Sequence, residues 1–216
     1  MKKILIICLS VTMVLMEKLP NDVRWVTNSK EYIFLCKQVY KNATKELVSF
    51  LENKNDTNLA IIMDLDETVL DNSRYQIELF EKNQTFNMDS WSKWVLREEA
   101  NLVPGAKEYI QFIRKNNIQL IFLSNRMNDR LEATKNNLKK MNIYSDDDIY
   151  LLRLDKKDKK YIRREEVYNS TGRMKKYKNF KIIQYLGDAA GDFPSLDDEN
   201  IGKTQFIFPN PMYGKW

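Results

Sequence analysis

The sequence predicts a three-layer α/β sandwich, in which helices cover both faces of a parallel sheet, with a small and mostly helical cap beside it. Three observations predict this fold class. Short apolar stretches recur along the chain, helical segments lie between them, and the 216 residues are 43% hydrophobic and 30% charged. Strands that alternate with helices favour a parallel sheet. A globular chain of this length forms one medium-sized domain with room for a small appendage.

The N-terminal residues have the pattern of an export signal. Lys2 and Lys3 precede an apolar run from Ile4 to Met16, which suits the hydrophobic region of a signal peptide and is short for a membrane span. We therefore expect residues 1–22 to be an export signal or an uncleaved anchor, and the protein to lie in a bacterial periplasm or cell envelope. The alternative is a first helix buried against the core.

The remaining elements follow in chain order after Pro20. Apolar residues at helical spacing indicate a long helix over residues 29–53, and five apolar residues predict the first strand over 59–63. Pro104 suits the beginning of the next core helix. The other expected helices cover 104–117, 129–141 and 161–167, and the other expected strands cover 119–123, 149–154, 182–186 and 204–208.

The segment between Leu70 and Val103 is polar, contains aromatic residues and shows no strand pattern. We interpret residues 72–103 as a cap inserted into the core. Residues 58–71 and 104–216 then form the core, and residues 23–57 form an N-terminal helical segment that packs with the cap.

The composition excludes several kinds of catalytic site. The chain has no histidine, and its two cysteines are Cys8 and Cys36. A Ser–His–Asp triad, a histidine-ligated zinc or haem, and a cysteine zinc site are therefore excluded. The net charge is +5, but the basic residues are scattered, so we expect no nucleic acid polymer as a partner. Catalysis would rest on carboxylates, lysine or serine, together with a hard metal ion.

Polar residues follow four of the predicted strands. In chain order they are Asp64 with Asp66, Ser124-Asn125-Arg126, Lys160, and Gly187-Asp188 with Asp192. The carboxyl ends of parallel strands meet at one edge of a sheet, where such folds bind ligands. Residues two apart at the end of a strand point the same way, so Asp64 and Asp66 converge. We therefore expect one site at this edge.

These four motifs resemble those of the haloacid dehalogenase superfamily. Within it, the chain is similar to the class C acid phosphatases, also called the lipoprotein e family of 5′-nucleotidases. The resemblance runs from about residue 23 to the last residue. It is carried by residues 29–32, 64–73, 91–95, 103–106, 124–126, 160–164, 187–193 and 208–216. It implies a Rossmann-like core of the haloacid dehalogenase type and a Mg²⁺-dependent acid phosphatase acting on small phosphomonoesters, with nucleoside 5′-monophosphates as the expected substrates.

The resemblance also implies a role for each matching residue. Asp64 is the expected nucleophile and Asp66 the general acid and base. The other expected roles are Mg²⁺ binding by Asp64, Asp188 and the Asp66 carbonyl, phosphate binding by Ser124, Asn125 and Lys160, base stacking by Phe86 and Tyr213, and support of these groups by Thr68 and Asp192. Lys159 is the alternative to Lys160, whose spacing to the following arginines fits the family better.

Three other functions remain open. A dehalogenase is disfavoured, because such enzymes do not use the acid and base that Asp66 supplies here. An Asp-x-Asp pair also binds metal–nucleotide-sugars in glycosyltransferases. A glycosyltransferase function would leave the other three motifs unexplained. Some plant relatives are non-catalytic storage proteins on the same fold, although those tend to lose the nucleophile that Asp64 supplies here. A membrane attachment through the N-terminus and a homodimer are both compatible with the sequence.

Overall fold

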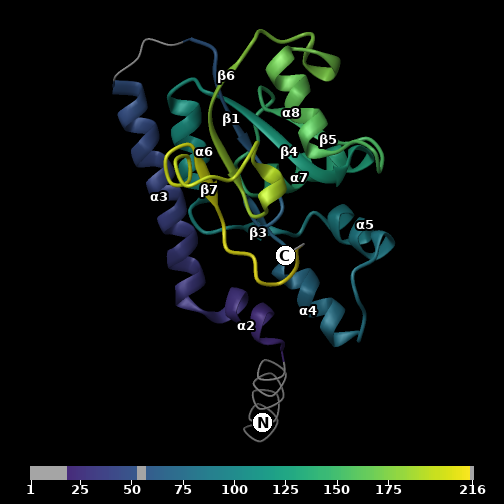
Figure 1. Cartoon of the computed structure of the whole chain (residues 1–216). Helices are drawn as coiled ribbons and strands as arrows, with labels where there is room; N and C mark the ends of the chain where they lie inside the picture. The colour runs from purple at the N-terminus through teal and green to yellow at the C-terminus, as the bar shows by residue number, and fades with distance from the viewer. Residues whose placement is uncertain (1–18, 53–56, 215–216) are drawn as a thin grey trace, which may run out of the picture.

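Five strands form a parallel sheet through the centre of the molecule (Figure 1). The computed structural model describes residues 19–52 and 57–214. The strands lie in the order β5-β4-β1-β6-β7, and each neighbouring pair is parallel. Their bounds are β1 Leu59–Met63, β4 Gln119–Met127, β5 Ile149–Arg153, β6 Lys181–Gly187 and β7 Gln205–Ile207. The predicted fold class is confirmed.

Alternate residues of the central strand face two different layers of helices. Ile61 and Met63 of β1 belong to the larger core, which packs against α3 (Lys30–Glu52), α6 (Ala106–Lys115) and α7 (Leu131–Lys140). Ala60 and Ile62 belong to the smaller core beneath α8 (Lys160–Asn169). Because both faces are covered, β1 is buried along its whole length, which explains its unbroken apolar sequence.

The insertion between β1 and α6 contains two helices, α4 (Ser73–Glu81) and α5 (Met88–Arg97). The side chain of Asn87 caps α5 by accepting a hydrogen bond of 2.8 Å from the Ser90 N–H. The sequence shows no strand pattern in this segment, yet β2 (Leu70–Asp71) pairs with the antiparallel β3 (Asn101–Leu102) at its base. Strands of two residues are too short to produce a detectable alternation of apolar and polar residues.

The N-terminal part of the described chain is helical. A short helix that the sequence pattern did not predict, α2 (Asn21–Asn28), precedes α3 and lies beside α4 (Figure 1). Ser29 separates the two helices, and its hydroxyl accepts a hydrogen bond from the Tyr32 N–H. The predicted export signal falls largely on residues 1–18, outside the described residues. Within the described ranges, no helix is long and apolar enough to cross a membrane.

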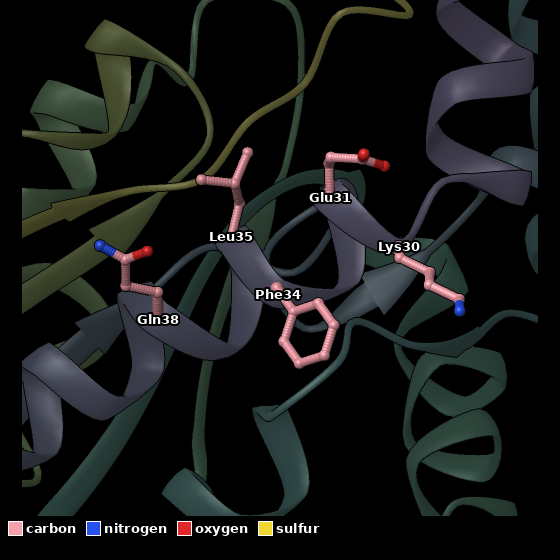
Figure 2. A pocket seen from close by; sticks show the side chains of 5 residues that line it. All are labelled: Lys30, Glu31, Phe34, Leu35 and Gln38. Carbon is pink, nitrogen blue, oxygen red and sulfur yellow. The ribbon is translucent and has the colours of Figure 1, made fainter.

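A shallow groove lies on the outer face of α3 (Figure 2). It is lined by Lys30, Glu31, Phe34, Leu35 and Gln38, and the Phe34 ring projects into solvent. None of these residues belongs to the four polar motifs at the strand ends. The groove therefore takes no part in the site that follows.

Candidate active site

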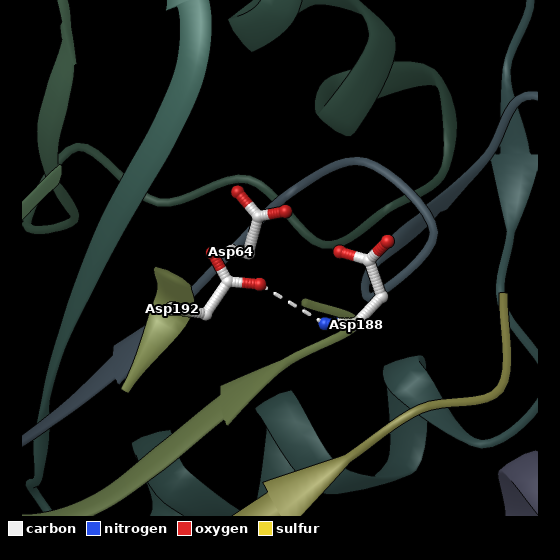
Figure 3. A group of neighbouring side chains, drawn as sticks. All are labelled: Asp64, Asp188 and Asp192. Carbon is white, nitrogen blue, oxygen red and sulfur yellow. Dashed lines mark hydrogen bonds between the residues drawn. The ribbon is translucent and has the colours of Figure 1, made fainter. Parts of the chain in front are cut away.

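Three carboxylates gather at the carboxyl edge of the central strands (Figure 3). Asp64 directly follows β1, Asp188 directly follows β6, and Asp192 ends a short 3₁₀ turn after β6. One carboxylate oxygen from each lies within 4.8 Å of the others. Asp64 and Asp192 are buried, and Asp188 is half-buried. The strand-end motifs therefore meet as the parallel topology requires.

The loop after β6 is held by Asp192. Its Oδ2 accepts hydrogen bonds from the backbone N–H groups of Asp188 at 3.1 Å and Ala189 at 3.0 Å. Gly187 permits this approach, because a Cβ at that position would lie 2.3 Å from the Asp192 Cβ. The close approach of the Asp192 side chain therefore explains why this motif has a glycine at position 187.

Lys160 lies between two of the carboxylates. Its Nζ is 2.6 Å from Asp64 Oδ1 and also contacts Asp192 Oδ1, while its side chain is only 9% exposed. Burial alone would lower the pKa of Lys160, but the two carboxylates outweigh it and raise that pKa above its ordinary value. Burial raises the pKa of Asp64 well above its ordinary value, against the effect of Lys160. Lys159 is exposed.

The donors at this edge fit a hard divalent cation. The site offers three carboxylates, and oxygen is the ligand atom that such cations prefer. Asp64 Oδ1 is buried and accepts no hydrogen bond within the described residues, although Lys160 lies beside it. Burial, with Asp192 beside it, also raises the pKa of Asp188 to about 6. A cation would relieve this repulsion between carboxylates.

The Asp66 carboxylate contacts two residues of β4 and one residue that directly precedes α4. Its Oδ1 accepts hydrogen bonds from Arg126 Nε at 2.9 Å and from Asn72 Nδ2 at 3.0 Å. Its Oδ2 lies 3.5 Å from the hydroxyl of Ser124, which is fully buried. Asp66 and Ser124 therefore lie side by side.

Asn125 follows Ser124 on β4 and is exposed. Its Oδ1 accepts a hydrogen bond of 2.8 Å from Arg163, a buried arginine of α8 whose guanidinium also donates to the Ser124 carbonyl. Arg163 thus ties the end of β4 to the helix that carries Lys160. Thr68 is buried behind the site, where its carbonyl accepts a 2.5 Å hydrogen bond from the Tyr40 hydroxyl.

Two side chains of the C-terminal segment donate hydrogen bonds to carboxylates at the site. Asn210 Nδ2 donates to Asp188 Oδ2 at 2.7 Å, and the Tyr213 hydroxyl donates to Glu67 Oε1 at 2.8 Å. Glu67 is buried, and this burial raises its pKa well above the ordinary value. The Tyr213 side chain is therefore anchored beside the loop that carries Asp64 and Asp66.

Phe86 lies in the cap, in the segment before α5, and is 57% exposed. Its ring centroid is 6.2 Å from that of Trp91, which is half-buried and packs edge-on against Tyr75. Trp94 is buried and donates a 2.8 Å hydrogen bond to Asn72 Oδ1. The tryptophans pack with Tyr75 inside the cap, and among the described residues the Phe86 ring is paired with Trp91 and not with Tyr213.

Four polar residues of the site received no role in the sequence analysis: Glu67, Asn72, Arg126 and Asn210. Each lies inside a stretch that carries the family resemblance, and three of the four are buried. The sequence signal that could have identified them is a charged or amide side chain inside a stretch that carries the resemblance. Their partners are set by tertiary contacts, which local spacing does not encode.

Fold and site together define an α/β protein with a carboxylate and lysine centre at the edge of its sheet. The model of the HAD superfamily, subfamily IIIB (acid phosphatase), matches residues 9–216. This chain belongs to that family. It is similar to the class C acid phosphatase from Bacillus anthracis, whose crystal structure with tungstate bound is 27% identical in sequence, with a TM-score of 0.79. That match covers 89% of this chain and 84% of the other.

Two plant proteins are also similar. The stem 31 kDa glycoprotein of Glycine max is 28% identical over 158 residues, which cover 70% of this chain and 58% of that protein. Vegetative storage protein 1 of Arabidopsis thaliana is 27% identical over 192 residues, covering 88% of this chain and 67% of that protein. The chain thus spans less than two thirds of the soybean protein.

Proposed function

We propose that this protein is a Mg²⁺-dependent acid phosphatase that hydrolyses small phosphomonoesters, with nucleoside 5′-monophosphates preferred. The observation that carries the proposal is the pairing of Asp64 with Lys160, 2.6 Å apart, beside Asp188. It joins a nucleophilic carboxylate to a fixed positive charge for an anionic substrate. The similar Bacillus anthracis enzyme binds tungstate, a tetrahedral oxyanion like phosphate, which adds support.

In the first half of the proposed reaction, an oxygen of Asp64 forms a bond to phosphorus as the bond to the leaving oxygen breaks. Asp66 gives its proton to that leaving oxygen, a contribution of about 10²–10⁴-fold in such reactions. Lys160 and the Ser124 hydroxyl face the phosphoryl oxygens. A divalent cation held by Asp64 and Asp188 supplies charge neutralisation when bound.

In the second half, a water oxygen forms a bond to phosphorus as the bond to Asp64 breaks. Asp66 takes the proton from that water and returns to its starting state. The products are an alcohol and inorganic phosphate, so atoms and protons balance. Asp192 supports both halves by holding the loop of Asp188 and by contacting Lys160.

The nucleotide preference rests on two aromatic residues. Tyr213 is anchored beside the catalytic loop and Phe86 is exposed on the cap. A site that binds its substrate by stacking on such rings accepts any nucleobase, since every base has a π face. We propose these two rings as the base site, residues 72–103 as the cap, and the cell envelope as the place of action.

A storage role is the second candidate, because Vegetative storage protein 1 is among the similar proteins. The assembled set of Asp64, Lys160 and Asp188 favours the enzyme, since a storage protein has no need of an ion-paired buried carboxylate. Phosphate release separates the two functions.

The test measures phosphate release from nucleoside monophosphates, sugar phosphates and p-nitrophenyl phosphate, with Mg²⁺ and with EDTA. We expect release with Mg²⁺, its loss in EDTA and its return when Mg²⁺ is added back. Full activity in EDTA would remove the metal from the proposal. No release from any substrate, by protein that is folded and loaded with Mg²⁺, would favour the storage role.

A further inference from the structure

The two oxygens of the Asp66 carboxylate have very different surroundings. Oδ1 lies 2.9 Å from Arg126 Nε, 2.8 Å from an Arg126 terminal nitrogen and 3.0 Å from Asn72 Nδ2. Among the described residues, the hydrogen-bond partner of Oδ2 is the Ser124 hydroxyl, at 3.5 Å. Three donors therefore converge on one oxygen and leave the other almost unengaged.

Arg126 is fixed in this position. Its side chain is 1% exposed, one terminal nitrogen donates to Thr134 Oγ1 at 3.2 Å, and the guanidinium lies 5.8 Å from the centre of the Trp91 ring. A buried guanidinium is costly unless its charge is paired, and Asp66 is the carboxylate that pairs it. The planar fork of arginine also fixes the direction of its partner, which a lysine does not do.

Asn72 is fixed as well, and its amide orientation follows from its neighbours. The indole Nε1 of Trp94 donates to Asn72 Oδ1 at 2.8 Å, and indole nitrogen is only a donor. Asn72 Nδ2 must therefore be the atom that faces the carboxylates of Asp66 and Glu67, at 3.0 and 3.1 Å. The cap helix that carries Trp94 thus helps to aim Asn72 at Asp66.

We propose that Arg126 and Asn72 are positioning residues that hold Asp66 by Oδ1 and so reserve Oδ2 for the proton exchanged with substrate and water. This inference rests on the proposed phosphatase function. When Oδ2 carries the proton, Oδ1 is still a carbonyl-like acceptor, so both donors keep their partner. Asp66 then keeps one orientation through both halves of the reaction.

Proton transfer balances through this single oxygen. In the first half, the Oδ2–H bond breaks and the proton goes to the leaving oxygen as its bond to phosphorus breaks. In the second half, water loses a proton to Oδ2 as its oxygen binds phosphorus. A freely rotating carboxylate would instead spend part of its time with the proton aimed away from the substrate.

The test compares leaving groups in the Mg²⁺-loaded enzyme. An alkyl phosphate needs protonation of its leaving oxygen, whereas p-nitrophenyl phosphate leaves with little help. We expect Arg126→Gln to lower kcat/KM for the alkyl phosphate at least about tenfold more than for p-nitrophenyl phosphate, since general acid catalysis is worth about 10²–10⁴-fold. We use kcat/KM because it reports the step in which the leaving group departs.

Two further variants keep the test decisive. Arg126→Lys retains the positive charge but not the planar fork of the guanidinium. We expect it to lower kcat/KM selectively for the alkyl phosphate, by a smaller factor than Arg126→Gln. If Arg126→Gln does not fold, Arg126→Lys takes its place in the comparison. Arg114→Gln breaks a 2.7 Å ion pair with Asp148 at the opposite edge of the sheet, and it should lower stability while leaving the substrate ratio unchanged.

The outcomes separate this inference from the function on which it rests. Absence of phosphate release by the wild-type protein would overturn the proposed function itself. An active wild type, together with folded Arg126 variants that lose the same factor on both substrates, would overturn only the positioning role. A loss confined to KM would count against it too, because a positioning residue for Asp66 acts on the chemical step.

Discussion

The ammonium group of Lys160 lies 2.6 Å from Oδ1 of Asp64, and the two side chains are only 9% and 7% exposed. Lys160 reaches this point from the first turn of α8, while Asp64 comes from the end of β1. The contact therefore links two segments nearly a hundred residues apart. In the proposed reaction, this positive charge would lie between the anionic substrate and the attacking carboxylate.

Replacement of this lysine should damage both activity and stability. We expect Lys160→Gln to lower kcat at least about 10²-fold, the range seen when one stabilising group for transition-state charge is removed. Without Mg²⁺ the variant should also unfold more easily, because breaking a buried ion pair costs about 3–5 kcal/mol. Phosphate release and urea unfolding measure the two effects.

Lys159→Gln is the matched control, since Lys159 is the neighbouring residue and is exposed. Its activity should stay near wild type and its stability should change by less than about 0.5 kcal/mol. A greater loss from Lys159→Gln than from Lys160→Gln would reverse the assignment of the two lysines.

A methyl group at Gly187 should disrupt the site. The added Cβ would lie 2.3 Å from the Asp192 Cβ, so Gly187→Ala must displace the residue that holds the loop of Asp188. Overpacking of this kind typically costs about 1–3 kcal/mol. We expect lower thermal stability and weaker Mg²⁺ binding, measured by calorimetry.

Gly191→Ala tests whether the effect is specific to that contact. A Cβ on Gly191 would meet no atom within 4 Å. The variant should keep its stability and its affinity for Mg²⁺. If both alanine variants behaved alike, steric contact with Asp192 would not be the reason for the glycine at 187.

Stability without metal should depend on pH through Asp188. Its folded pKa of about 6 lies above the ordinary value of 3.8, so the folded protein holds this proton more tightly than the unfolded chain. The resulting stabilisation is present below about pH 4 and is lost as the pH rises to about 6. Other buried carboxyls with a raised pKa, such as Asp148, contribute a similar loss in both proteins. Thermal unfolding of wild type and Asp188→Asn, both in EDTA, should therefore show a larger loss of stability between about pH 4 and about pH 6 in wild type.

The same proton competes with a bound cation. Mg²⁺ should therefore raise the melting temperature of the wild-type protein more at pH 7.5 than at pH 5. An equal Mg²⁺ effect at the two pH values would show that Asp188 does not titrate in this range. It would also weaken the case for Asp188 as a ligand.

The aromatic base site makes a prediction that depends on the substrate. Stacking is worth about 1–3 kcal/mol per base, so Tyr213→Ala should lower kcat/KM for a nucleoside monophosphate roughly five- to a hundredfold, mainly through KM. A short alkyl phosphate has nothing to stack and should suffer much less. Steady-state kinetics on both substrates gives the ratio.

Tyr213→Phe separates the ring from its hydroxyl, which donates to Glu67. Tyr213→Phe keeps the stacking face, so its kcat/KM for a nucleoside monophosphate should be closer to that of wild type than the value for Tyr213→Ala. If Tyr213→Ala depressed both substrates equally, Tyr213 would be structural, and the preference for nucleotides would have no support from this residue.

Local pattern predicted the sheet well because its signals are local. The apolar run of β1 matches its predicted bounds, and each strand-end motif follows from the parallel topology. The bounds of the second predicted strand were less accurate. It was expected to end at Leu123, but β4 continues to Met127, because polar residues at a strand end resemble the beginning of a loop.

Contacts between distant segments were beyond the reach of the sequence. Tyr213 reaches Glu67 across 146 residues, and Arg126 reaches Asp66 across 60. Both are set by how the C-terminal segment and β4 lie against the loop after β1. Asp64 and Lys160 could be selected from their places at strand ends, whereas the contacts of Arg126 and Asn72 with Asp66 could not.

The most direct test of the account is to look for the phosphoryl group on Asp64. Enzyme turning over a nucleoside monophosphate with Mg²⁺ is quenched in acid, digested and analysed by mass spectrometry, beside Asp64→Asn treated in the same way. The account predicts one phosphoryl group on the Asp64 side chain of the wild type, and neither that group nor turnover in the folded variant. Continued turnover by folded Asp64→Asn, or a phosphoryl group on another residue, would contradict it.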